Sequence, residues 1–94
     1  MVKVRWSKDS IEALKEICLY IAQDSVYYAK MFNDRVFEMV EHLEIFPDMG
    51  RHVPESDVEN VREIIYKSYR IIYQKKNDYL EIITIIHGSR LLKL

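Results

Sequence analysis

The last third of the chain contains three runs of β-branched and aromatic residues, each of which predicts a β-strand. We expect these strands at residues 61–66, 69–74 and 79–87. Cationic or titratable side chains lie within the runs or just after them, namely Arg62, Arg70, His87 and Arg90. Burial of an unpaired charge is costly. Each of the four is therefore expected to pair with a carboxylate or to lie at a surface that meets an anion or a protein partner.

The first sixty residues predict one strand, two helices and a loop. Apolar and charged residues alternate over residues 2–6, which is typical of a half-buried strand. Ser7 and Ser25 are suited to cap two amphipathic helices, and Pro47 ends the second helix. Because the link between them is short, the helices are expected to pack as an antiparallel hairpin. Residues 47–60 are rich in turn-forming residues and predict a loop.

The predicted order is therefore β-α-α-β-β-β, an α+β fold in which a small, mainly antiparallel sheet packs against an N-terminal helical hairpin. A two-residue turn at 67–68 would place Arg62 and Arg70 on opposite faces of the sheet. A turn that is one residue longer would place them on the same face. The last strand is mainly apolar on both faces, so we expect it in the interior of the sheet with helices covering one side.

Length, charge and cysteine content limit the possible functions. The 94 residues fit a single domain over residues 1–94. No apolar run approaches the roughly 20 residues of a membrane span, and no long apolar stretch follows the N-terminal charges, so we expect a cytoplasmic protein without a signal peptide. The net charge of −1 argues against a protein whose whole surface binds nucleic acid, although the last third is positive. The single cysteine, Cys18, excludes an internal disulfide.

Each titratable candidate has a structural and a functional interpretation. Arg62 and Arg70 can pair with loop or cross-strand carboxylates, or they can bind phosphate through the guanidinium fork. His87 can be a general acid or base, or a structural histidine. Arg90 can be a solvated side chain near the chain end or part of the same site. The three histidines share no metal-ligand spacing and no glycine-rich phosphate loop is present, so we predict neither a metal nor a cofactor.

Four short motifs follow one another in a recognisable order. They are PDMGR at 47–51, VRE at 61–63, YRIIY at 69–73 and HGSR at 87–90. Together they resemble the RelE/ParE superfamily of toxins from bacterial type II toxin–antitoxin systems, over nearly the whole chain and with the same element order. RelE-like members cut messenger RNA inside the ribosome, with basic residues on the sheet and a C-terminal aromatic residue. ParE-like members share the fold and are known for poisoning DNA gyrase.

The resemblance is closer to the ParE side. Arg70 and Arg90 match positions that are basic in the nucleases, and Arg62 falls near a position that holds lysine there. Ile64 stands where the next inward basic residue is expected, and no tyrosine follows Arg90. The resemblance thus implies a ParE-like toxin that inhibits growth, and supports plasmid stabilisation, by binding a cellular target such as DNA gyrase.

The same resemblance implies a cognate antitoxin as partner. Its C-terminal segment would wrap the toxin with a helix or an added strand, and the basic side chains of the last third would contact an acidic antitoxin tail. DNA would be contacted only through the antitoxin, and no membrane is involved. Two alternatives stay open: a metal-independent, ribosome-dependent endoribonuclease that uses Arg62, Arg70, His87 and Arg90, and a non-toxic interaction domain of the same fold.

Overall fold

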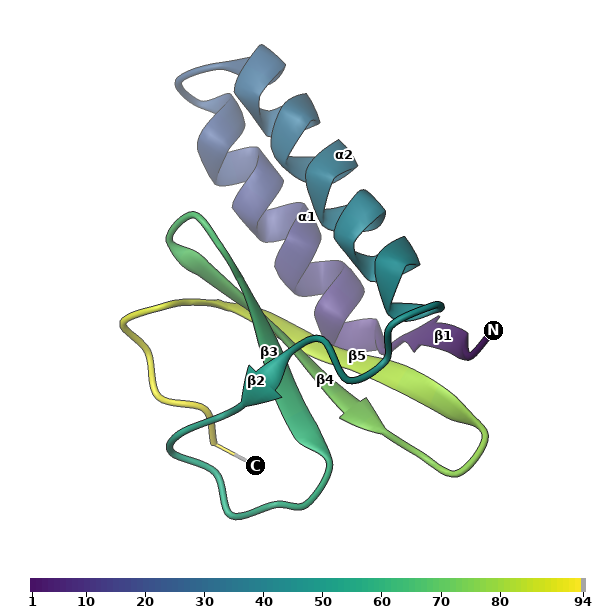
Figure 1. Ribbon diagram of the computed structural model, residues 1–94. Coiled ribbons are helices and arrows are strands. Elements are labelled where there is room, and N and C mark those ends of the chain that lie inside the picture. Colours follow the sequence, from purple (N-terminus) through teal and green to yellow (C-terminus); the bar gives the residue numbers. More distant parts are fainter. Residues whose placement is uncertain (94) are drawn as a thin grey trace.

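The structure is a computed structural model that describes residues 1–93. Two helices lie side by side against a five-stranded sheet (Figure 1). The elements are β1 (Lys3–Trp6), α1 (Lys8–Ala22), α2 (Val26–Leu43), β2 (Arg51–His52), β3 (Val61–Tyr66), β4 (Tyr69–Lys75) and β5 (Tyr79–His87). The predicted α+β class and the β-α-α-β-β-β order are confirmed, and the two-residue strand β2 is an addition within the predicted loop.

The strands lie in the order β1-β5-β4-β3-β2. β1 runs parallel to β5, and the other neighbouring strands are antiparallel. The predicted interior position of the last strand is confirmed, because β5 lies between β1 and β4. β2 escaped prediction because its two residues are both exposed and polar, so they show none of the apolar alternation that marks a half-buried strand.

Serine caps begin both helices, as the sequence predicts. The Ser7 hydroxyl accepts a hydrogen bond from the amide of Ser10 at 3.0 Å, and Ser25 accepts one from the amide of Tyr28 at 3.1 Å. Ser7 also donates to the carbonyl of Ile83 at 2.8 Å, which ties the start of α1 to β5. Within the described part of the chain, no helix combines the length and apolar character needed to cross a membrane.

Apolar residues form a core on each face of the sheet. The larger core lies between the helices and the sheet and contains Leu14, Phe32, Val36, Val40, Leu43, Ile71, Tyr73, Leu80, Ile82 and Ile85. The smaller core lies on the other face and contains Val53, Val61 and Ile72, with Ile83, Ile86 and Leu92 packed against them. Loop and C-terminal residues therefore cover the face that the helices leave open, which explains why both faces of β5 are apolar.

A β-bulge in β5 distributes its isoleucines between the two cores. Ile72 pairs with Thr84, but the next residue of β4, Tyr73, pairs with Ile82, so Ile83 is the extra residue. The bulge turns both Ile82 and Ile85 toward the helices, although an uninterrupted strand would point residues three apart to opposite faces.

The chain between α2 and β2 is held by a tyrosine from the sheet. The buried Tyr73 hydroxyl donates to the carbonyl of Pro47 and accepts from the amide of Gly50, both at 2.9 Å. Burial raises the pKa of Tyr73, which keeps the hydroxyl protonated and able to donate. A Cβ atom at Gly50 would lie 2.6 Å from the Tyr73 hydroxyl and 2.8 Å from the carbonyl oxygen of Glu63, so only glycine fits this position without a shift.

We expect Gly50→Ala to lower the free energy of unfolding by about 1–3 kcal/mol, because the new methyl group overpacks a site bounded by backbone and a buried ring. Urea unfolding followed by circular dichroism measures this loss. Gly88→Ala is the matched control, since its Cβ would meet the Ser68 carbonyl oxygen at 3.3 Å and should cost less. Equal losses in the two variants would contradict this account of Gly50.

Candidate functional site

The turn between β3 and β4 determines where the two arginines of the hairpin point. Residues 67–68 form a two-residue turn, and in the register that follows Arg62 pairs with Tyr73 whereas Arg70 pairs with Ile65. Cross-strand partners point to the same face of a sheet. Arg62 therefore lies on the face toward the helices and Arg70 on the opposite face, which is the outcome predicted for a two-residue turn.

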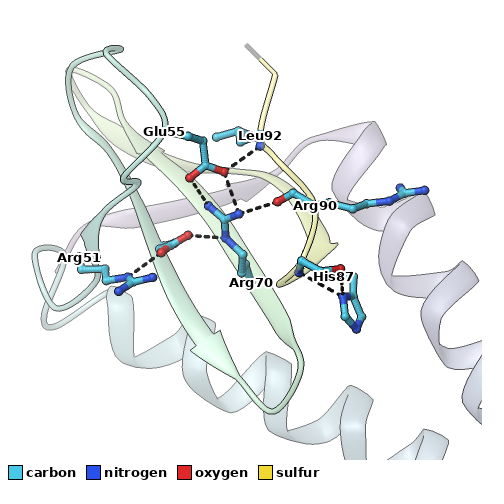
Figure 2. A network of polar contacts seen from close by, with 8 residues as sticks. Arg51, Glu55, Arg70, His87, Arg90 and Leu92 are labelled. Carbon is cyan, nitrogen blue, oxygen red and sulfur yellow. Dashed lines mark hydrogen bonds and ion pairs between the residues drawn. The ribbon is translucent and has the colours of Figure 1, made fainter.

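Arg70 lies at the centre of a buried polar network (Figure 2). Its Nε donates to Oε1 of Glu63 at 2.6 Å, and its Nη2 donates to Oε1 of Glu55 at 2.8 Å. Its Nη1 donates to the backbone carbonyl of Arg90 at 2.7 Å. The side chain is only 7% exposed, so its charge is compensated within the chain. The structural interpretation of Arg70, a carboxylate partner across the sheet, is confirmed. The alternative expectation, that Arg70 lies at a surface that meets an anion or a protein partner, is wrong.

Glu63 connects this network to a second arginine. The side chain of Glu63 is fully buried, and its second oxygen accepts a hydrogen bond from Nε of Arg51 at 2.6 Å. Arg51 is largely exposed, so it shields the buried carboxylate from one side while Arg70 neutralises it from the other. A buried carboxylate without such partners would be strongly destabilising. The sequence also allowed Arg51 to pair with an acidic residue of the loop at 47–60, but its partner is Glu63 on β3.

The segment that follows β5 folds back over the same face of the sheet (Figure 1). The backbone amide of Leu92 donates to Oε2 of Glu55 at 2.8 Å, and the Leu92 side chain packs against the smaller core. Because the carbonyl of Arg90 also accepts from Arg70, this segment is attached to the network at two points. The C-terminal segment thus covers the side of Arg70 that would otherwise face solvent.

The network lowers the pKa of Glu55, the more exposed of its two carboxylates. The hydrogen bond from Arg70 and the weaker effect of the Leu92 amide lower the pKa of Glu55 from 4.5 to about 2. The same hydrogen bond raises the pKa of Arg70. Glu55 is therefore ionised throughout the physiological pH range, and the pair acts as a fixed clamp between the loop after β2 and strand β4.

Arg62 holds the loop before β2. Its Nη1 donates to the carbonyl of Gly50 at 2.7 Å and more weakly to that of Asp48 at 3.3 Å. Its Nε lies 3.9 Å from the Asp48 carboxylate, which is the loop carboxylate predicted as one of its structural partners. Arg62 therefore braces a loop on a different face of the sheet from Arg70.

His87 and Arg90 are exposed. Nδ1 of His87 lies 2.7 Å from the Ser89 hydroxyl, and its ring meets the edge of Tyr69 at a centroid distance of 5.6 Å. The Arg90 side chain points away from Arg70 (Figure 2), and no ion pair of its guanidinium is found within residues 1–93. Three of the four predicted candidates, Arg70, His87 and Arg90, line one cleft, and Arg62 lies on the other face of the sheet. The guanidinium of Arg70 in this cleft is bonded to Glu63 and Glu55, so it is not free to stabilise a phosphate.

The structure has a concave surface beside the Arg70 network and another between the two helices. A cleft of about 520 Å³ lies beside the network and is lined by residues including Arg51, Arg70, His87 and Arg90. A mainly apolar groove of about 540 Å³ lies between α1 and α2. The sequence pattern did not single out this groove, although Leu19 and Val26 lie outside the core-facing stripes and are 62% and 74% exposed. Among residues 1–93, no three His, Cys, Asp or Glu side chains gather as a metal site.

We expect the free energy of unfolding to depend on the ionisation of Glu55, because the Arg70–Glu55 pair joins the loop after β2 to strand β4. Because the folded-state pKa of Glu55 is lowered, its contribution is present above pH 4.5 and is lost as the pH falls toward 2. Glu55→Gln should therefore be less stable than the wild type near neutral pH, and the difference should close over this window. Thermal unfolding at a series of pH values measures it. Glu59→Gln, in the same loop but outside the network, should follow the wild type, and a constant gap for Glu55→Gln would contradict the clamp.

Comparison with known proteins agrees with the fold described above. Residues 4–92 match the family described as "ParE toxin of type II toxin-antitoxin system, parDE". A solved structure described as "Chromosomal ParDE TA system from P. aeruginosa" is similar to this chain, with 20% sequence identity and a TM-score of 0.77. That alignment covers 95% of this chain and 98% of the other, and at this identity the likeness concerns the fold. A comparison with curated proteins gives no match.

The family match extends from β1 to the C-terminal segment that covers Arg70. It therefore includes both helices, the complete sheet and the loop held by Tyr73 and Arg62. On this basis the chain belongs to the family of ParE toxins of type II toxin–antitoxin systems.

Proposed function

We propose that residues 1–94 act as a single toxin domain that stops growth by binding a protein target, and that a cognate antitoxin neutralises it. DNA gyrase is the target that the resemblance to ParE toxins implies, so the site of action would be the cytoplasm. The observation that carries this proposal is the family match over residues 4–92 together with the internal neutralisation of Arg70. A toxin of this kind acts through its surface and needs no reactive centre.

The state of Arg70 supports binding over RNA cleavage. A nuclease without a metal needs free cations to stabilise the charge that develops on the phosphate, and a group that moves the proton. Arg70 occupies the matching basic position, but its fork is bonded to Glu63 and Glu55 and lies under the C-terminal segment. His87 lines the same cleft as Arg70, whereas Arg62 lies on the other face of the sheet. A RelE-like endoribonuclease is therefore the weaker alternative, and the net charge of −1 disfavours a surface for polyanions.

The groove between α1 and α2 fits an antitoxin helix. Its lining is mainly apolar, and Lys15 and Lys30 stand at its sides. An amphipathic helix that lays its apolar face into such a groove buries area that neither protein can bury alone. The two lysines favour a partner helix whose flanks carry carboxylates. Contact with DNA would then come through the antitoxin and not through this chain.

Expression of the chain alone in bacteria tests the proposed activity. We expect growth arrest, loss of plasmid supercoiling and an induced DNA-damage response, with messenger RNA left intact. The same cells are assayed for colony formation, plasmid topology and RNA cleavage, so that the three outcomes are compared under one induction.

The alternatives give distinct results in the same experiment. Cleaved messages with normal plasmid supercoiling would reverse the assignment in favour of a ribosome-dependent endoribonuclease. Normal growth, with both readouts unchanged, would indicate an interaction domain without toxicity. Co-expression with the product of an adjacent short reading frame should restore growth if that product is the antitoxin.

We expect Leu19→Glu to weaken antitoxin binding by at least about tenfold, because a carboxylate would then lie in the apolar groove. Leu19 is 62% exposed, so the change should leave folding intact. Isothermal titration with the cognate antitoxin measures the effect. Ile45→Glu is the matched control, since Ile45 is 60% exposed and does not line the groove. Equal affinities for Leu19→Glu and the wild type would exclude the groove as the antitoxin site.

A further inference from the structure

The apolar groove between α1 and α2 contains a single amide side chain, that of Asn33. The α2 residues that line the groove form one helical stripe, which begins at Val26, ends at Phe37 and includes Asn33. The two apolar ends of the stripe are exposed, at 74% and 43%. With a rise of about 1.5 Å per residue, the stripe is about 16 Å long, which is roughly three turns of an incoming helix. Asn33 therefore lies within the surface that such a helix would cover.

The Asn33 side chain has hydrogen-bonding capacity that this chain leaves unused. Its Oδ1 lies 4.0 Å from Sγ of Cys18, across the groove on α1. Burial raises the pKa of the Cys18 thiol, so the sulfur keeps its proton and is the donor in this weak contact. Within residues 1–93, no hydrogen bond of Nδ2 of Asn33 is found. Its N–H donors are accessible to solvent instead, since no buried side-chain nitrogen in this part of the chain lacks a partner.

A partner that fills the groove removes solvent from Asn33. An amide whose donors lose water and gain no protein acceptor weakens binding, roughly tenfold to a hundredfold for one group. Only an occupant with an acceptor oxygen opposite Asn33 avoids this loss. A neutral amide in an apolar groove therefore discriminates between helices of similar shape, because it rejects those that cannot pair with it.

The helix itself does not require asparagine at this position. Asparagine is among the weaker helix formers, and leucine or alanine would be more favourable within α2. The side chain is half-buried and caps neither end of the helix, since the caps are Ser25 and Glu44. A residue that departs from local preference without a structural gain is expected at a functional surface.

The charges of the groove indicate an acidic helix as its occupant. The charged residues that line it are Lys15 and Lys30, and no ion pair of either is found within residues 1–93. Carboxylates on the flanks of an incoming helix would pair with both lysines. A second copy of this chain that docked groove to groove would instead place these cations against their own counterparts, which disfavours self-association.

We propose that Asn33 is the specificity-determining residue of the antitoxin site. The antitoxin inserts an acidic amphipathic helix, and one polar residue on the apolar face of that helix offers an acceptor oxygen to Nδ2 of Asn33. Asparagine, glutamine, serine and threonine side chains can do this. This inference rests on the proposed function, in which the groove holds the antitoxin. It adds the contact by which the toxin distinguishes its own antitoxin from other acidic helices.

Asn33→Leu tests this contact, because leucine keeps a branched side chain and removes both donors. Its affinity for the purified product of the adjacent short reading frame is measured by isothermal titration. We expect a loss of at least about tenfold, with a urea midpoint no lower than that of the wild type. Asn33→Asp, which keeps the size but lacks the N–H donors, should lose at least as much. His42→Leu is the matched control and should bind like the wild type, since His42 is exposed on α2 and does not line the groove.

A compensating change distinguishes a direct contact from a structural effect. Each polar residue on the apolar face of the antitoxin helix is replaced by leucine, one at a time, and is titrated against the wild type and against Asn33→Leu. One replacement should weaken binding to the wild type and restore binding to Asn33→Leu, because neither protein then buries an unpaired polar group. If no replacement shows this coupling, the inference is overturned.

The outcomes separate this inference from the proposed function. Wild-type or higher affinity in either Asn33 variant, while Leu19→Glu weakens binding, overturns the inference alone. If Leu19→Glu also binds like the wild type, or if the wild type does not bind the product at all, the antitoxin site and the inference fall together. A toxin dimer that sedimentation detects and that Leu19→Glu dissociates would assign the groove to a second copy and overturn both. Absence of growth arrest overturns the proposed toxicity alone, since the affinity comparison does not depend on it.

Discussion

The buried chain of charges through Glu63, Arg70 and Glu55 is the interaction on which this fold depends. It joins β3 and β4 to the loop after β2, and through the Arg90 carbonyl it also fastens the C-terminal segment. The helices cover the other face of the sheet, so these contacts and a small apolar core hold the loop and the C-terminal segment against this face. The ions can be buried only because each carboxylate meets a guanidinium at 2.6–2.8 Å.

This constraint also bears on function. An arginine on the sheet of this fold can serve chemistry only if its charge is free, and Arg70 is bonded on every side. The apolar groove between the helices is a concave surface that remains open in this fold.

Local patterns in the sequence predicted most of the fold. Alternating and β-branched runs marked the strands, and Ser7 and Ser25 marked the helix starts, because these signals depend only on neighbouring residues. The register of the β3–β4 hairpin stayed open, since Lys67 adopts a φ of 53° that is usual for asparagine or glycine and not for lysine. The bulge at Ile83 was hidden by the uniform run of isoleucines around it.

The site was less predictable than the fold because it depends on contacts between distant residues. The sequence identified Arg70 as a candidate and predicted a carboxylate partner across the sheet as one possibility. Arg62 and Glu63 are consecutive residues of the strand, however, and no local pattern shows which of them faces inward. Glu55 is remote in sequence from both Arg70 and Leu92, and it meets them only after the loop and the C-terminal segment fold onto one face. The conformation of the loop at residues 47–50 likewise depends on Tyr73, which bonds to a loop more than twenty residues earlier in the sequence.

A double-mutant cycle on Glu63 and Arg70 tests the central claim most directly. Glu63→Leu and Arg70→Leu are made singly and together, and the free energy of unfolding is measured in urea. The account predicts that each single change costs about 3–5 kcal/mol, because it leaves a buried charge unpaired, and that the double change costs far less than the sum. Small losses that simply add would contradict it, since Arg70 would then not be held by this network.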